Sequence, residues 1–463
     1  MTGELATLDA LSAAAAVRSG AASATEIAEA VLAHIVARNP SLNAFTAITG
    51  ERALADARAL DRRRALGEML PPLAGAPFAV KNLFDVAGLI TLAGSKIDAE
   101  RPPAAADAFI VKKLTAAGAV LVGALNMDEY AYGFTTENTH YGAAHNPHDT
   151  THVAGGSSGG SAAVVAAGLV PVALGSDTNG SIRVPSSFCG TFGLKPTYGR
   201  LSRSGTRGFV ASLDHVGPLA RTVGDLAASY DAMQGANPGD PACAGRPLEA
   251  SIPGLEHGAN GLRIAVAGGH FAGSGVAAEA VASAAKSLGA TRIVEVPEAA
   301  RARAAAYVIT ASEGADLHLA DLKSRAADFD PMTRDRFLAG ALVPAVWVLR
   351  AQRFRRWYRE RVMELFRDID ILLAPATPCQ APRIGQETIE IGGVTVPSRP
   401  FIGVYTQPLS FIGLPIVAAP LRRPGELPIG VQIIAAPWRE ADALRVARAL
   451  ERDGVTNAEP VLG

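Results

Sequence analysis

Short apolar runs that alternate with helical patterns constrain the fold of this chain more than any other feature. Runs typical of strands occur at residues 77–81, 119–125, 169–176, 262–268, 370–376 and 430–436. Between them, apolar residues recur at the three- and four-residue spacing of amphipathic helices. Strands that are apolar on both faces need helices on both sides of the sheet. The alternation therefore predicts an α/β protein with a central, mostly buried sheet.

The N-terminal part of the chain departs from this alternation. Its apolar positions keep helical spacing from Ser12 to Gly67, with turns at Asn39-Pro40 and near Gly50. We therefore expect a helical N-terminal segment over about residues 1–67.

No stretch of the chain has the pattern of a leader or a membrane span. Glu4 and Asp9 precede the first apolar stretch, where a signal peptide would carry Lys or Arg. The longest run without charged residues, 153–176, contains several glycines and Pro171, so it is poorly suited to cross a bilayer. We expect a cytoplasmic protein that does not enter a membrane.

The charge balance excludes some classes of partner. Lys and Arg total 43 against 44 Asp and Glu, which leaves no basic surface for nucleic acid or an anionic membrane. A net charge of −1 favours association, so we expect an oligomer. Cys189, Cys243 and Cys379 are odd in number and far apart, which is typical of a reducing compartment.

Residues 261–296 have the pattern of a strand, a glycine-rich turn, a helix and a second strand. The turn lacks a clean G-x-G-x-x-G, and the acidic residue that dinucleotide-binding folds carry about 20 positions further on is missing. This segment is therefore predicted to be an ordinary βαβ unit.

Two clusters of serine and glycine, at residues 155–161 and 177–181, flank a small-residue apolar run. A flexible linker would stay solvated, whereas this run is suited to burial. A phosphate-binding loop would end in Lys-Ser or Lys-Thr, which this one lacks. A third interpretation is a nucleophile, Ser181, on a tight D-x-N-G turn whose N–H groups converge on an oxyanion. Taken alone, such a turn is also compatible with a purely structural role.

A serine nucleophile needs a base, and the sequence offers two kinds. Histidines 140, 145, 148 and 152 crowd into one polar loop, but their spacings fit no standard zinc site, and a solvated loop explains them better. Lys81 ends the apolar run 77–81, where burial would favour the neutral amine. The alternative is a lysine whose head reaches solvent at the end of a strand.

Together, Lys81 in GAPFAVKNLFD, the cluster GGSSGGS and the segment DTNGSIRVPSSFCGTFGLKPTYGRLSR resemble the amidase signature family. Further segments, such as HNPHDTTHVAGGSSGG and DILLAPATP, extend the resemblance over roughly residues 12–451. The family implies a single large α/β domain over residues 1–463, with a twisted, mixed central β-sheet flanked by helices.

The resemblance also implies a proton relay. Ser181 is expected to be the nucleophile, Lys81 the base, and Ser157, which follows a cis peptide bond in the family, the bridge between them. Neutral Lys81 takes the proton of Ser157 as Ser157 takes that of Ser181, and Ser181 Oγ attacks the amide carbonyl.

The loop around the nucleophile is expected to hold the oxyanion through the backbone N–H groups of Thr178, Asn179 and Gly180, together with that of the nucleophile itself. Asp177 and Arg183 are expected to support this loop, with a structural ion pair as the alternative. Many family members have Gly-Gly where this chain has Asn179-Gly180. Asn tolerates left-handed backbone conformations, so the loop survives, and its side chain is available to contact the substrate.

Neither the fold nor the relay selects a substrate. Segments 176–190 and 328–358 most resemble the 1-carboxybiuret hydrolases of cyanuric acid breakdown, which implies C–N bond hydrolysis in a small carboxylated ureide with release of ammonia. A buried substrate carboxylate would need an arginine fork, for which Arg334 and Arg336 are the candidates; a solvated helix face is the alternative. The relay requires no cofactor and no metal.

Three other functions stay open at this point. One is the glutaminase subunit of a tRNA-dependent amidotransferase, although residues 312–331 lack its usual Asn-Leu-Ala-Arg-Tyr-Asp-Gly stretch. The others are an aliphatic or aryl amidase and a non-catalytic binding subunit. Both the carboxybiuret enzymes and the amidotransferase subunit resemble proteins that work beside a small helical partner, so such a partner is expected here as well.

Overall fold

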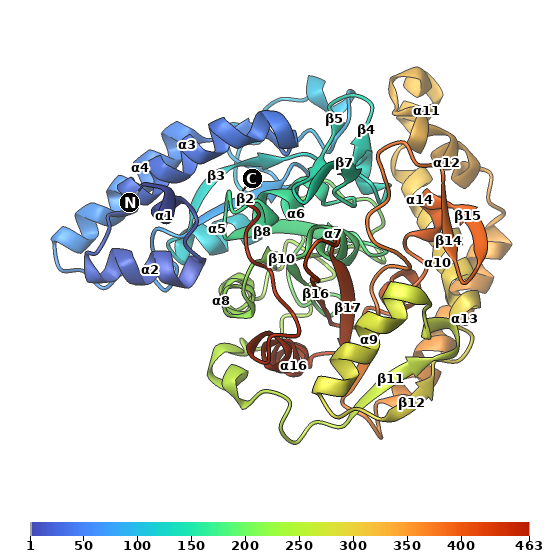
Figure 1. Cartoon of the computed structure of the whole chain (residues 1–463). Coiled ribbons are helices and arrows are strands. Elements are labelled where there is room, and N and C mark those ends of the chain that lie inside the picture. The colour runs from blue at the N-terminus through green and yellow to red at the C-terminus, as the bar shows by residue number, and fades with distance from the viewer. Residues whose placement is uncertain (1, 463) are drawn as a thin grey trace.

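An eleven-stranded mixed sheet forms the centre of the molecule (Figure 1). The computed structural model describes residues 2–462, and the strand order is β1-β3-β2-β8-β10-β9-β16-β17-β13-β11-β12. These strands are β1 (Phe45–Ile48), β2 (Pro77–Lys81), β3 (Val120–Leu125), β8 (Val172–Asp177), β9 (Phe192–Lys195), β10 (His215–Ala220), β11 (Ile264–Gly268), β12 (Arg292–Glu295), β13 (Ile371–Pro375), β16 (Ile416–Leu421) and β17 (Ile429–Ala435). The predicted α/β class with a mixed sheet is confirmed.

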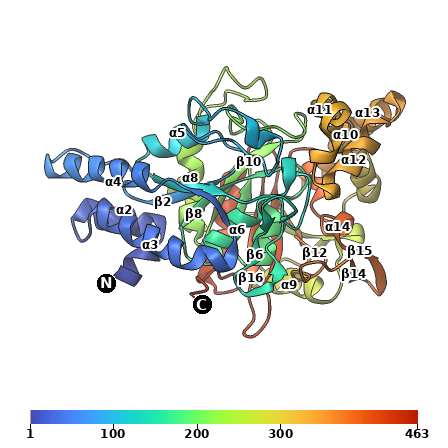
Figure 2. The same ribbon diagram turned by 90° about the horizontal axis from the view of Figure 1, so that it is seen from above.

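Helices flank this sheet on both sides and at both ends (Figures 1 and 2). They are α1 (Thr2–Ala6), α2 (Ala10–Ser19), α3 (Ala24–Leu42), α4 (Gly50–Ala65), α5 (Phe109–Ala116), α6 (Gly159–Ala166), α7 (Arg183–Cys189), α8 (Val223–Met233), α9 (Gly275–Ser287), α10 (Ala299–Leu317), α11 (Leu319–Arg325), α12 (Pro331–Ala341), α13 (Ala345–Leu365), α14 (Ser398–Phe401), α15 (Gln407–Ser410) and α16 (Glu440–Arg452). Three small hairpins lie outside the main sheet: β4 (Glu137–Asn138) with β5 (Gly142–Ala143), β6 (His145–Asn146) with β7 (Asp149–Val153), and β14 (Thr388–Ile391) with β15 (Val394–Pro397). Helices α2 to α4 lie at one end of the molecule and α10 to α13 at the other.

Side-chain caps explain where the N-terminal helices begin. Asp9 accepts from Ser12 N at the start of α2, and Ser23 forms a capping box with Glu26 at the start of α3. The segment also contains β1, which the helical pattern did not predict. This strand pairs antiparallel with β3 at the edge of the sheet.

The βαβ unit predicted at residues 261–296 is present, since β11 and β12 pair in parallel with α9 between them. Within residues 2–462, no helix combines the length and the apolar character needed to cross a membrane.

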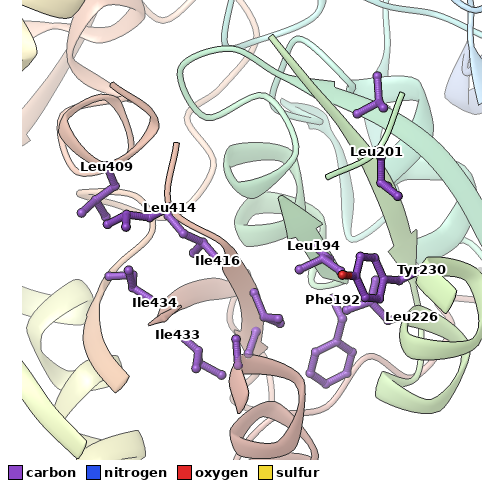
Figure 3. Packing of buried hydrophobic residues seen from close by; sticks show 14 of the residues in the cluster. Phe192, Leu194, Leu201, Leu226, Tyr230, Leu409, Leu414, Ile416, Ile433 and Ile434 are labelled. Atoms are coloured by element: carbon purple, nitrogen blue, oxygen red, sulfur yellow. The ribbon is translucent and has the colours of Figure 1, made fainter. Parts of the chain in front are cut away.

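The core lies between the sheet and its helices. Figure 3 shows Phe192 and Leu194 of β9 beside Leu226 and Tyr230 of α8, with Ile433 of β17 in the same apolar cluster. Since close packing leaves few voids, the strands that carry the site rest on a rigid support.

Strands β2 and β8 set the position of the candidate site. They pair in parallel, with Val80 opposite Leu174, so their carboxyl ends meet at the same edge of the sheet. Lys81 is the last residue of β2 and Asp177 the last of β8. Ligand sites of α/β proteins commonly lie at such carboxyl ends.

Candidate active site

Three serine hydroxyls surround the amine of Lys81, whose side chain is completely buried. Lys81 Nζ lies 2.7 Å from Ser157 Oγ, 2.9 Å from Ser176 Oγ and 3.1 Å from Ser158 Oγ. A neutral amine has two N–H donors and one lone pair, so three hydroxyls, each able to donate or accept, match it fully. The alternative, a lysine whose head reaches solvent, is wrong for this chain.

Burial changes the protonation of this lysine. Desolvation lowers the pKa of Lys81 from 10.5 to about 7, although the carboxylates of Asp128, Asp177 and Asp214 pull it the other way. Asp128 is itself fully desolvated, which raises its pKa to about 6. A large fraction of Lys81 is therefore neutral near pH 7.

Ser157 follows Gly156 through a cis peptide bond, the bond that the resemblance implies. A side chain on Gly156 would collide with Asp128, because an added Cβ would lie 2.1 Å from Asp128 Oδ2. Gly133 is equally close to the same carboxylate. Gly156 and Gly133 therefore make room for a buried acid, Asp128, that sequence reasoning did not single out.

The loop after β8 presents free backbone donors. Within residues 2–462, no hydrogen bond occupies the N–H groups of residues 178–181, so they are left for a ligand. Gly180 has φ +144°, and an added Cβ would lie 2.3 Å from Thr406 Oγ1, so only glycine fits there. Lys81 and Ser157 share a hydrogen bond, whereas among the described hydrogen bonds there is none between Ser157 and Ser181.

Asp177 and Arg183 form a buried bidentate ion pair, with both N···O distances at 3.0 Å. Burial alone would raise the pKa of Asp177, but the Arg183 guanidinium outweighs it and holds this pKa well below its usual range. Arg183 also donates to Gln432 Oε1 of β17 at 2.6 Å and to Thr406 O at 3.2 Å. The pair thus fastens the Ser181 loop to the C-terminal part of the chain.

Ser181 is one of the residues that line a small pocket. The pocket is lined by the loop after β3, the Ser181 loop, the loop between β9 and β10, and helices α10, α12 and α15. The lining residues are Ala131, Tyr132, Gly133, Phe134, Thr178, Asn179, Ser181, Phe209, Tyr307, Thr310, Arg336 and Gln407.

The two candidate arginines of α12 lie on different sides of that helix. Arg336 lines the pocket, donates to Tyr132 O at 2.7 Å and places its guanidinium 3.6 Å from the centre of the Tyr132 ring. Arg334 does not line the pocket and instead pairs with Asp335 at 2.9 Å on the outer surface. Of the two candidates, Arg336 is therefore the one that lines the Ser181 pocket.

Sequence reasoning missed the pocket residues of α10 and α15, namely Tyr307, Thr310 and Gln407. They stand more than 100 positions from the Ser/Gly clusters and belong to no local motif. It also missed Lys195, a second buried lysine whose pKa desolvation lowers to about 7. Lys195 donates to the backbone carbonyls of Pro196 and Leu414 and does not line the pocket.

The four histidines of the polar loop point to different partners and do not converge. The ring of His140 contacts Glu129 and that of His148 contacts the carbonyl of Cys189. The other two stay within their own hairpin, with His145 on Thr150 O and His152 beside Asp149.

Comparisons with known proteins relate this chain to amidases. A profile of amidases matches residues 26–444. The chain is 59% identical to AtzE, a component of 1-carboxybiuret hydrolase from Pseudomonas sp. (strain ADP), with 95% of this chain and 97% of that protein covered. It is 40% identical to one component of the glutamyl-tRNA(Gln) amidotransferase of Anaeromyxobacter sp. (strain K), with 97% of each covered. The structure is also similar to a chain of a solved complex, described as a vestigial protein complex that reveals the evolutionary origins of an s-triazine catabolic enzyme. The two superpose with a TM-score of 0.96 at 57% identity, and the match covers 98% of this chain and 100% of that one.

Proposed function

Since this chain belongs to the amidase family, we propose that it hydrolyses the terminal C–N bond of a small carboxylated ureide such as 1-carboxybiuret, with release of ammonia. The observation that carries the proposal is the buried Lys81 amine, which three serine hydroxyls surround and whose pKa lies at about 7. Such an amine can accept a proton at physiological pH, which an ordinary lysine cannot.

The relay conserves every proton. Neutral Lys81 accepts the proton of Ser157 while Ser157 accepts that of Ser181, and Ser181 Oγ bonds to the carbonyl carbon. The oxyanion accepts from the free N–H groups of the loop, each worth about 10² to 10³ in rate. As the C–N bond breaks, Ser157 protonates the nitrogen and recovers a proton from Lys81, and ammonia leaves. Water then attacks the acyl-enzyme by the same path.

Three features support a small anionic substrate. The pocket is small, Arg336 lines it, and the relative at 59% identity is a component of 1-carboxybiuret hydrolase. The glutaminase alternative rests on less similar relatives, at 40% identity.

Ammonia release tests this proposal directly. Purified protein is assayed with 1-carboxybiuret, biuret, allophanate, glutamine, a long-chain amide and an aryl amide, with the Ser181→Ala variant as control. We expect preference for the carboxylated ureides and no turnover by the variant. Turnover of glutamine alone would overturn the substrate, and equal turnover by Ser181→Ala would overturn the mechanism.

We also propose a small helical partner that binds at the start of α13. Leu342, in the turn between α12 and α13, is 82% exposed, and Val346 and Leu349 on the first turns of α13 are 47% and 62% exposed. The exposed Arg350 and Arg353 flank this apolar stripe, so it fits an amphipathic helix with acidic side chains. The structural relative was solved as a protein complex, which agrees with an assembly of this kind.

Calorimetric titration of the partner chain from that complex tests the stripe. We expect binding to the natural chain, and none to the Leu342→Glu/Leu349→Glu variant at an unchanged melting temperature. Arg334→Gln, which alters the neighbouring helix outside the stripe, is the matched control and should bind normally. Equal binding by all three proteins would exclude the stripe as the partner site.

A further inference from the structure

Asn179 lines the pocket, and its side chain has a buried, unsatisfied acceptor. Its Nδ2 donates to Thr310 Oγ1 at 2.9 Å, and its backbone carbonyl accepts from Thr406 Oγ1 at 2.6 Å. These two contacts fix the residue, which lines the pocket beside Ser181 and is only 8% exposed. Among the described residues, Asn179 Oδ1 has no hydrogen-bond partner. A buried acceptor left unpaired costs about 1 to 3 kcal/mol, so a bound molecule that donates to it is favoured.

Gln407, on α15, supplies a hydrogen-bond donor to the same pocket. Its Oε1 accepts from Arg303 Nε at 2.8 Å, which leaves Nε2 as the group that can donate to a bound molecule. Arg336 adds a cation in the same pocket. The lining thus combines one acceptor, one neutral donor and one guanidinium.

A carboxylated ureide carries the complementary groups. It has an N–H next to the attacked carbonyl, a further carbonyl oxygen and a terminal carboxylate. An aliphatic amide acid of equal length has a methylene in place of that N–H, and a methylene cannot satisfy an acceptor. Sites built to hydrogen-bond a substrate N–H reject analogues that lack it far more strongly than apolar pockets reject an altered methylene.

We propose that Asn179 Oδ1 accepts a hydrogen bond from the substrate N–H next to the attacked carbonyl, and that this contact selects ureides over carbon chains. The inference rests on the proposed function, because it concerns the same pocket. It gives the asparagine that replaces a family glycine a role of its own, in addition to the backbone N–H of that residue.

Two stable acids that differ by one group isolate this contact. 3-Ureidopropionate and glutaramate are both carboxylated amides of equal charge, but only the first has an N–H next to the carbonyl that Ser181 would attack. Their dissociation constants are measured by calorimetry on the Ser181→Ala protein, which cannot consume either. We expect the ureide to bind about tenfold or more tightly, and the ratio to fall to about one in Ser181→Ala/Asn179→Leu.

Asn179→Asp is the second variant, because it keeps an oxygen acceptor. Its added charge weakens both anions alike, so the ratio between them should stay in favour of the ureide. An unchanged ratio in the leucine variant, or no preference in the Ser181→Ala protein itself, would overturn the inference. The proposed function fails separately, if the natural protein releases no ammonia from 1-carboxybiuret.

Discussion

Lys81 Nζ lies 2.7 Å from Ser157 Oγ, closer than to either of the other two hydroxyls around it. A hydroxyl so placed can pass its proton to the amine when the amine is neutral. We therefore expect the activity of the protein to depend on the ionisation of this one buried lysine.

The pH dependence of kcat/KM follows from that ionisation. The pKa of Lys81 is about 7, and only the form present above it is a base. We expect kcat/KM to rise about tenfold per pH unit below 7 and to level off above it. Lys81→Arg, which stays charged at every pH, should be inactive throughout. Lys195→Met is the control and should keep the same limb; loss of the limb in this control would assign it to Lys195.

The unfolding free energy should also depend on the ionisation of Lys81. The pKa of Lys81 is about 7 when folded and about 10.4 in an unfolded chain, so the unfolded state binds more protons between these values. The folded state therefore gains stability with rising pH in that window, by up to about 1.4 kcal/mol per pH unit. Urea unfolding of the natural chain and of Lys81→Met from pH 7 to 10 measures the difference, in which Lys195 cancels. A difference that stays constant with pH would contradict the shift.

Substitution of the serines around Lys81 distinguishes a hydroxyl that transfers protons from one that only holds the amine in place. Ser157→Ala should lower kcat about 10²- to 10⁴-fold, because it removes the bridge to Ser181. Ser158→Ala takes away another hydroxyl bonded to the same amine, and should cost less than about tenfold. Steady-state kinetics of the two variants decides the matter, and equal losses would argue against a specific bridge.

Arg336 and Arg334 form a matched pair for substrate binding. Arg336→Gln should raise KM for carboxylated ureides about 10- to 100-fold, the worth of a charge-assisted hydrogen bond. Arg334→Gln changes only a surface pair with Asp335 and should leave KM unchanged. Kinetics with 1-carboxybiuret and with uncharged biuret compares them. A similar KM increase for biuret would mean that Arg336 shapes the pocket without reading a carboxylate.

Arg183 should matter for stability as well as for catalysis. Arg183→Met leaves the Asp177 carboxylate buried and uncompensated, which costs about 3–5 kcal/mol of unfolding free energy. Adding Asp177→Asn removes that charge and should restore part of the stability but not the activity, because the loop has lost its fastening. Urea denaturation together with ammonia assays tests both statements, and a loss below about 1 kcal/mol for Arg183→Met would refute the first.

The sequence predicts strands best where they are continuous and apolar. The runs that became β2, β3, β8, β11, β13 and β17 were all identified, because such strands are buried on both faces. Strand β10, with glycine and proline inside HVGPLA, was not, since both residues weaken a strand pattern. Its position between β8 and β9 comes from long-range pairing that no local window contains.

Within the site, too, residues in local motifs can be predicted from the sequence, whereas residues brought in by long-range contacts cannot. Lys81 and Ser157, whose hydrogen bond the structure contains, both stand in motifs that the sequence displays. Arg334 and Arg336 were not separable by sequence, because two positions on a helix differ by about 200° and only packing decides which faces inward. The burial of Asp128 could not be predicted for another reason. The two glycines that make room for its carboxylate, Gly133 and Gly156, belong to different loops.

The fastening of the Ser181 loop also bears on how the protein is made. Lys81, Ser157 and Ser181 all leave the ribosome before the chain is half synthesised, whereas the groups that hold Arg183 lie at Thr406 and Gln432. The three proposed relay residues are thus synthesised long before the residues that hold Arg183 in place. We therefore expect a nascent chain to lack hydrolase activity until β17 has been translated, so that Ser181 stays inactive while the protein is still being built.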